Sequence, residues 1–136
     1  MTEEKRILLH PISEALAKVY NQLYEIKEVK FPLYDTHLKN IDTVVKNVEA
    51  IYYGKELYPT PQVKAAAYFC FIIKDHPFTD GNKRMAVLWL DILCEVYDIT
   101  MTLPKSMTLD VLAVSVEAEK QFSIRELIML VRTILF

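Results

Sequence analysis

Residues 76–84 have the sequence His76-Pro77-Phe78-Thr79-Asp80-Gly81-Asn82-Lys83-Arg84. Two of the most apolar segments of the chain flank this polar stretch, residues 63–73 before it and residues 85–90 after it. Apolar residues fill most positions of both segments, which is typical of buried helices. Proline disfavours helix at the residue before it. The pattern therefore predicts one helix, a short polar loop, and a second helix that begins near Asn82.

The start of the second helix has the features of an anion site. Gly81 permits a backbone conformation that other residues resist, and the free N–H groups of a helix that starts at Asn82 suit phosphate. Lys83 and Arg84 follow in the first turn, where the helix dipole disfavours cations. We therefore expect an anion to compensate these two charges.

Two further side chains complete the set that phosphoryl transfer requires. Asp80 could hold a divalent cation that bridges phosphate oxygens, and His76 could take a proton from a hydroxyl group. Each residue also has an ordinary structural explanation, because a His-Pro pair often ends a helix and an Asp-Gly pair often forms a turn. Several compatible roles within one short loop favour the functional interpretation.

The stretch resembles the signature of the Fic/Doc (Fido) superfamily, which in Fic enzymes is His-Pro-Phe-x-Asp/Glu-Gly-Asn-Gly-Arg-x-x-Arg. Lys83 stands at the second glycine of that signature and Val87 at its last arginine. Both departures are those of the Doc branch. The resemblance includes residues 57–60 and 64–66 and extends more weakly to the last helices, so it covers roughly residues 40–136.

The resemblance implies an all-α Fido fold of about six helices with a short β-hairpin flap, here at roughly residues 52–58. In this superfamily the flap binds the target protein by strand addition and presents a hydroxyl to the catalytic histidine. Doc is similar to Fic in fold, but it binds the nucleotide reversed and moves the γ-phosphate instead of AMP. Lys83 therefore favours a kinase-like transferase that moves phosphate from ATP, or another NTP, to a Ser/Thr hydroxyl of a target protein.

The resemblance also assigns roles to the signature residues. The base is His76, the Mg²⁺ ligand is Asp80, the phosphate ligands are Asn82, Lys83 and Arg84, and Gly81 is a main-chain donor. A Doc-like protein is expected to be the toxin of a toxin–antitoxin pair. Two alternatives stay open, namely Fic-type AMP transfer (AMPylation) and an inactive Fido fold that acts as a binding module.

Fic proteins often carry an inhibitory helix with the pattern Ser/Thr-x-x-x-Glu-Gly/Asn, whose Glu pairs with the last signature arginine. Residues 115–119 match the first part, but Lys120 breaks the last position. Val87 removes the arginine. We interpret the match as chance.

Length and composition indicate one compact domain. The chain has 136 residues, 52% of them hydrophobic, and only two glycines, so a single domain over residues 1–136 is expected. A net charge of −2 argues against nucleic-acid binding as the main activity. Cys70 and Cys94 lie in apolar helical patterns and are expected to be reduced core residues.

Membrane and metal signals are weak. Charged residues interrupt the apolar runs, and the acidic start of the chain does not fit a signal peptide, so a cytoplasmic protein is expected. His10 and His37 have no metal-ligand spacing and are interpreted as ordinary surface histidines.

The apolar periodicity, caps and breakers also predict the individual elements. The expected helices cover residues 12–27 with Ser13 as cap, 35–53, the segment after Thr60 with Pro61 first, 82–97, 108–119, and a last helix opened by a Ser123–Glu126 capping box. Trp89 is expected in the core. The last helix, residues 127–136, is apolar nearly all round, so it is either a core helix or a surface that an antitoxin or a second copy covers.

Overall fold

A computed structural model describes residues 10–136 of the protein. Within that range the chain forms six helices and one antiparallel hairpin, so the predicted all-α Fido fold with a small hairpin is confirmed. The elements are α2 (Pro11–Glu25), α3 (Asp35–Val48), β1 (Ile51–Tyr52), β2 (Lys55–Glu56), α4 (Pro61–Asp75), α5 (Asn82–Tyr97), α6 (Leu109–Ala118) and α7 (Ile124–Leu135).

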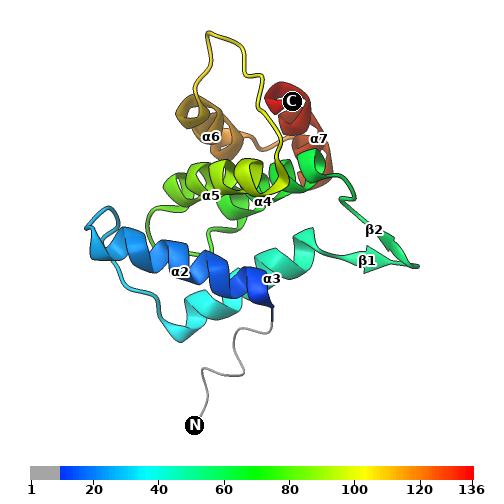
Figure 1. The fold of residues 1–136 in the computed structure, drawn as a ribbon. Helices are drawn as coiled ribbons and strands as arrows, with labels where there is room; N and C mark the ends of the chain where they lie inside the picture. The colour runs from blue at the N-terminus through cyan, green and yellow to red at the C-terminus, as the bar shows by residue number, and fades with distance from the viewer. Residues whose placement is uncertain (1–9) are drawn as a thin grey trace.

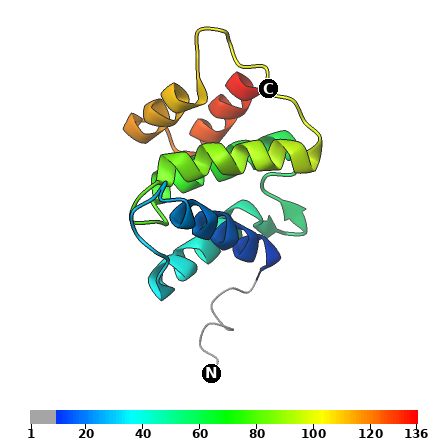
Figure 2. The ribbon, with the colours of Figure 1, turned by 60° about the vertical axis from the view of Figure 1, so that its left-hand side comes forward.

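The helices form three layers (Figure 1). α4 and α5 lie in the middle, α2 and α3 cover one side of them, and α6 and α7 cover the other, as the turned view also shows (Figure 2). The contacts between elements agree, because α4 packs against α3, α5, α6 and α7. The loop between α4 and α5, which is the signature stretch, therefore lies where all three layers can reach it.

The central helix α4 explains why the fold is stable. Every residue from Val63 to Ile73 is buried, including Lys64. Three alanines at Ala65–Ala67 let neighbouring helices approach closely, and large side chains such as Tyr68 fill the space on other faces. Trp89 of α5 is 5% exposed and packs edge-on to Tyr68, which confirms its predicted place in the core.

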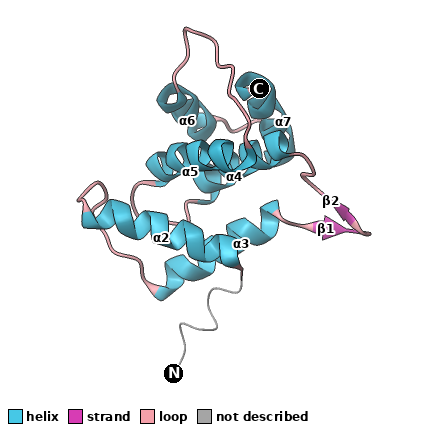
Figure 3. Cartoon of the chain, viewed as in Figure 1, coloured by secondary structure: helices cyan, strands magenta, loops and turns pink. Residues whose placement is uncertain are grey.

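The hairpin β1–β2 projects from one side of the molecule (Figure 3). Tyr53 and Gly54 form its turn, both with positive φ. The sequence predicted a helix up to residue 53, and this was wrong, because α3 ends at Val48 and residues 51 and 52 pair with the next strand. Helical spacing of apolar residues ran on through Ile51, but its side chain is exposed on the hairpin.

Buried polar groups fix the base of this hairpin. Lys64 donates to Glu56 of β2 at 2.9 Å and to Glu49, just after α3, at 3.2 Å. Tyr68 donates to the other oxygen of Glu49 at 2.7 Å. Burial lowers the pKa of Lys64, but the two carboxylates outweigh this and raise it overall. The hairpin is therefore attached to α4 by a charged cluster, and its tip is left exposed.

Helix caps agree with the sequence at most ends. Thr60 caps α4, and Ser123 and Glu126 form the predicted capping box of α7. The prediction that Ser13 caps the first helix was wrong. His10 accepts the N–H of Ile12 instead, and Ser13 is fully buried inside α2.

The last helix packs with one face against the core. Leu127, Ile128, Val131 and Leu135 are buried, but Met129 and Leu130 are about half exposed. That an antitoxin or a second copy covers this surface stays a prediction. None of the described helices combines the length and apolar character that crossing a membrane requires.

Candidate functional site

His76 ends α4 in a left-handed backbone conformation, with φ 49° and ψ 58°. This region is uncommon for residues other than glycine and is often found at functional sites. The helix stops there, and the imidazole, about half exposed, faces the C-terminal end of α6. Its Nδ1 lies 3.3 Å from the carbonyl of Lys74, and its Nε2 lies 3.2 Å from Glu117 Oε2.

The loop after His76 is fixed by aromatic packing and by Asn82. Phe78 is 3% exposed and stacks on Tyr20 of α2 with ring centroids 4.5 Å apart. The Asn82 amide accepts the N–H of Phe78 at 3.0 Å and donates to its carbonyl at 2.8 Å. Since this side chain is occupied, the predicted role of Asn82 in phosphate binding rests on its main-chain N–H.

Gly81 is required at the start of α5 for two reasons. Its φ is +79°, and a Cβ added there would lie 2.5 Å from a methyl carbon of Val29. Any side chain would therefore be strained in conformation and would clash with the segment after α2. The glycine leaves the first N–H groups of α5 open to the side where a phosphate would bind.

Two glutamates compensate the two cations of the first turn, as expected from the helix dipole. Lys83 Nζ lies 3.0 Å from Glu117 Oε1, and Arg84 Nη1 lies 2.7 Å from Glu28 Oε1. All four side chains are partly exposed. Each of the two cations of the first turn thus has a carboxylate partner from another part of the chain.

Glu117 connects Lys83 to His76, and sequence reasoning did not find it. Hydrogen bonds from Lys83 and then His76 hold the pKa of its carboxyl below the usual range. Lys74 donates to the main-chain carbonyls of Glu117 and Glu119 at the end of α6, which fixes this end next to His76. Glu119 of the inhibitory-type pattern instead accepts the N–H groups of Gln121 and Phe122.

Both ring nitrogens of His76 face acceptors, a main-chain carbonyl and a carboxylate. Nε2, the nitrogen on the side of α6, is engaged by the Glu117 carboxylate at 3.2 Å. A general base must have a free nitrogen. Glu117 therefore has to move away from His76 before the ring can accept a proton from a hydroxyl.

Asp80 lies in the loop with one carboxylate oxygen fixed. Its Oδ2 accepts the main-chain N–H of Lys30 at 3.1 Å. Among residues 10–136 no group of three or more metal-ligating side chains is present. A cation at Asp80 would therefore need ligands from a bound phosphate and from water, which is how Mg²⁺ is commonly held.

His37 is not the ordinary surface histidine that the sequence suggested. It lies in the first turn of α3 and is 7% exposed. Its Nε2 lies 2.7 Å from the hydroxyl of Thr79, the residue before Asp80. The two residues are 42 positions apart, so no local pattern could reveal the contact.

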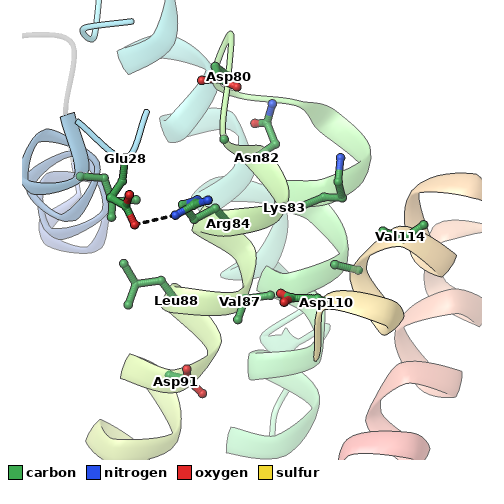
Figure 4. Close-up of a pocket in the computed structure, with 13 residues that line it drawn as sticks. Glu28, Asp80, Asn82, Lys83, Arg84, Val87, Leu88, Asp91, Asp110 and Val114 are labelled. Atoms are coloured by element: carbon green, nitrogen blue, oxygen red, sulfur yellow. Dashed lines mark hydrogen bonds and ion pairs between the residues drawn. The ribbon is translucent and has the colours of Figure 1, made fainter. Parts of the chain in front are cut away.

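A cleft of about 700 Å³ runs along α5 from the signature loop. Asp80 lies at one end with Lys83 and Arg84 next along α5, and Asp91 lies at the other end, as Figure 4 shows. The residues that line the cleft are Leu23, Glu28, Asp80, Gly81, Asn82, Lys83, Arg84, Val87, Leu88, Asp91, Asp110, Ala113 and Val114. His76 is not among them, but Glu117 contacts both His76 and the cleft-lining Lys83.

In a comparison with protein-family models, residues 6–94 match the Fic/DOC family. The matched range covers well over half of the chain and includes the whole signature stretch. It ends within α5, so Glu117 lies outside it. No curated protein and no solved structure matches the chain.

Proposed function

This chain belongs to the Fic/DOC family, and from that premise we propose that it is a Doc-like transferase of the cytoplasm. Its proposed reaction moves the γ-phosphate of ATP, or of another nucleoside triphosphate, to a Ser/Thr hydroxyl of a target protein. Members of the family generally carry out nucleotide-dependent modification of protein hydroxyls. Transfer of label from γ-labelled ATP to proteins of a cell lysate tests the proposal.

One observation carries the proposal. The two oxygens of Glu117 are shared between His76 Nε2 and Lys83 Nζ, at 3.2 and 3.0 Å. A single small anionic group thus contacts both the candidate base and a phosphate-binding cation. A target hydroxyl next to His76 and a phosphate oxygen on Lys83 would therefore lie close to each other. In-line transfer requires this arrangement.

The direction of the cleft favours transfer of the terminal phosphate. An α-helix rises about 1.5 Å per residue, so Asp91 lies about 12 Å along α5 from Lys83. The apolar side chains Val87 and Leu88 lie between them. With the nucleoside along this apolar stretch, the phosphates extend toward Lys83 and the γ-phosphate comes nearest to His76.

In the proposed reaction one phosphorus–oxygen bond forms and another breaks. His76 takes the proton from the target hydroxyl, and the hydroxyl oxygen forms a bond to the γ-phosphorus. The bond from that phosphorus to the β–γ bridging oxygen breaks, and the nucleoside diphosphate leaves. Lys83, Arg84 and the first N–H groups of α5 stabilise the negative charge on the transferred group.

Asp80 fits the Mg²⁺ ion that accompanies the nucleotide in this family. Its Oδ2 accepts the Lys30 N–H, its Oδ1 has no hydrogen-bond partner among residues 10–136, and Asp80 lines the cleft. A bound Mg²⁺ would neutralise part of the negative charge of the phosphates. Asp80 would hold it with one carboxylate oxygen.

Asp80→Ala is expected to weaken ATP binding by at least about 10-fold when Mg²⁺ is present, and to have little effect in excess chelator. Titration calorimetry under both conditions measures this. Asp80→Asn is the matched control, because its amide oxygen can still accept the Lys30 N–H but carries no charge. An equal loss with and without Mg²⁺ would show that Asp80 has only a structural role.

Glu117→Gln is expected to strengthen ATP binding by roughly two- to five-fold, because the phosphate no longer has to displace a carboxylate from Lys83. The small size of the effect follows from the exposure of the ion pair. Glu119→Gln is the control, since Glu119 lies on the same turn but bonds to Gln121 and Phe122. Weaker binding by the Glu117 variant alone would contradict this account.

Two alternatives have some support. AMP transfer would need the α-phosphate next to His76, and the family includes this activity. An inactive fold that serves as a binding module would agree with a site whose base and both cations are paired with the chain's own carboxylates. That the protein is the toxin of a toxin–antitoxin pair stays a prediction from the Doc-like residues.

A further inference from the structure

The hydrogen bonds of His37 determine which of its nitrogens carries the proton. Its Nδ1 lies 3.0 Å from the main-chain N–H of Tyr34 and accepts from it. The ring can donate only through Nε2, which lies 2.7 Å from the Thr79 hydroxyl oxygen. The geometry therefore requires the neutral tautomer with the proton on Nε2. Protonation of both nitrogens would place two donors face to face at Tyr34.

The loop has other anchors on either side of Thr79. Phe78 is fixed by its stacking on Tyr20 and by the Asn82 amide, and Gly81 begins α5. Only Thr79 and Asp80 lie between these fixed points. The Lys30 N–H holds the side chain of Asp80, and His37 holds the side chain of Thr79.

The hydrogen bond to Asp80 and the hydrogen bond to Thr79 differ in length and in exposure. Lys30 is exposed and its bond to Asp80 is 3.1 Å long. His37 is buried and its bond to Thr79 is shorter. A short bond from a buried donor loses less to competition with water than one on the surface. Of the two hydrogen bonds that hold Thr79 and Asp80 to the layer of α2 and α3, the one from His37 is therefore the stronger.

We propose that His37 is a positioning residue for the reaction proposed above, acting through Thr79 to hold Asp80 where the Mg²⁺–nucleotide complex binds. It touches neither substrate nor metal. The part of this proposal that concerns nucleotide binding rests on the proposed function. The order of the loop can be measured without any nucleotide. His37 and Thr79 both lie within the range that matches the family.

Two pairs of variants separate positioning from a simple helix-capping role. His37→Asn places an oxygen where Nδ1 accepts the Tyr34 N–H. It therefore keeps the hydrogen bond at the start of α3 and loses the hydrogen bond to Thr79. His37→Gln places an N–H near the position of Nε2, so it keeps the bond to Thr79. Thr79→Ser keeps the hydroxyl and Thr79→Val removes it at almost unchanged volume.

We expect His37→Asn and Thr79→Val each to raise the dissociation constant of Mg²⁺–ATP by roughly 2- to 12-fold, the value of one hydrogen bond. His37→Gln and Thr79→Ser should stay close to wild type, and ATP binding in excess chelator should change little in all four. The double variant His37→Asn/Thr79→Val should be no worse than either single variant, because both remove the same bond.

A second measurement is independent of the proposed function. In the nucleotide-free protein, ¹⁵N relaxation should show lower order parameters at Thr79 and Asp80 in His37→Asn and Thr79→Val, with no change in Thr79→Ser. If wild type binds no nucleotide, the proposed function fails while this measurement still decides whether His37 positions the loop. Unchanged order in both bond-removing variants, or a defect in His37→Gln but not in His37→Asn, would overturn the proposal.

Discussion

His76→Ala is expected to lower the rate of phosphate transfer by about 10²- to 10⁴-fold while leaving nucleotide binding almost unchanged. A general base acts on the proton of the attacking hydroxyl and contributes little to the complex before reaction. The imidazole is about half exposed, and its hydrogen-bond partners among the described residues are the Lys74 carbonyl and Glu117, so its removal leaves no cavity in the core.

Single-turnover transfer and ATP titration, performed on the same preparation, measure the two quantities separately. His10→Ala is a suitable control, because His10 caps α2 far along the chain from the signature loop. Wild-type transfer by His76→Ala would remove His76 from the chemistry. Loss of ATP binding in step with transfer would instead assign it a binding role.

Lys83→Gly is expected to reduce γ-phosphate transfer by about 10- to 150-fold, the range for loss of one charge-assisted hydrogen bond. The ammonium group would neutralise the transferred phosphate, and a glycine offers no charge. Part of the loss could come from the helix, since glycine is a poorer helix former than alanine, by about 1 kcal/mol in a helix interior. Lys83→Ala controls for this and should lose nearly as much activity.

The same variant tests the relation to AMP transfer. Lys83→Gly restores the second glycine of the Fic signature, so weak AMP transfer is the expected gain. The gain is smaller than the loss, because Val87 still stands where AMP-transferring relatives carry an arginine. Transfer measured with ATP labelled at either phosphate reports both effects. Full γ-phosphate transfer by both Lys83 variants would contradict the role given to Lys83.

Much of the fold could be predicted from local pattern. α5 begins and ends at the predicted residues 82 and 97, since Gly81 and the apolar run define it. The caps at Thr60 and Ser123 also follow from neighbouring residues alone. The prediction failed at residues 49–53, where apolar spacing suited a helix. A Tyr53-Gly54 turn and the attachment of Glu56 to Lys64 favour a hairpin instead.

The candidate site was predictable only where its residues are adjacent in the chain. His76, Asp80, Lys83 and Arg84 lie within nine consecutive residues, and the last three of them line one cleft. Glu28 lies 56 residues from its partner Arg84 in the sequence, and Glu117 lies 34 residues from its partner Lys83. His37 lies 42 residues from its partner Thr79. No spacing rule links such positions, because the packing of the three helix layers alone brings them together.

Asn82 shows the same limit in another way. Its residue type suits phosphate binding, and its position at a helix start agrees with that role. The structure adds that its amide is bonded to both main-chain groups of Phe78. Whether the Asn82 side chain binds a phosphate or the main chain of Phe78 depends on the path of the loop, which the sequence alone does not show.

We propose that this protein moves the γ-phosphate of a nucleoside triphosphate to a protein hydroxyl. The most direct test incubates the wild-type chain and His76→Ala with a cell lysate and Mg²⁺, using γ-labelled ATP in one set and α-labelled ATP in the other. We predict labelled target protein from γ-labelled ATP alone, and none with His76→Ala. Label on protein from α-labelled ATP with the wild-type chain would contradict the claim and establish AMP transfer instead.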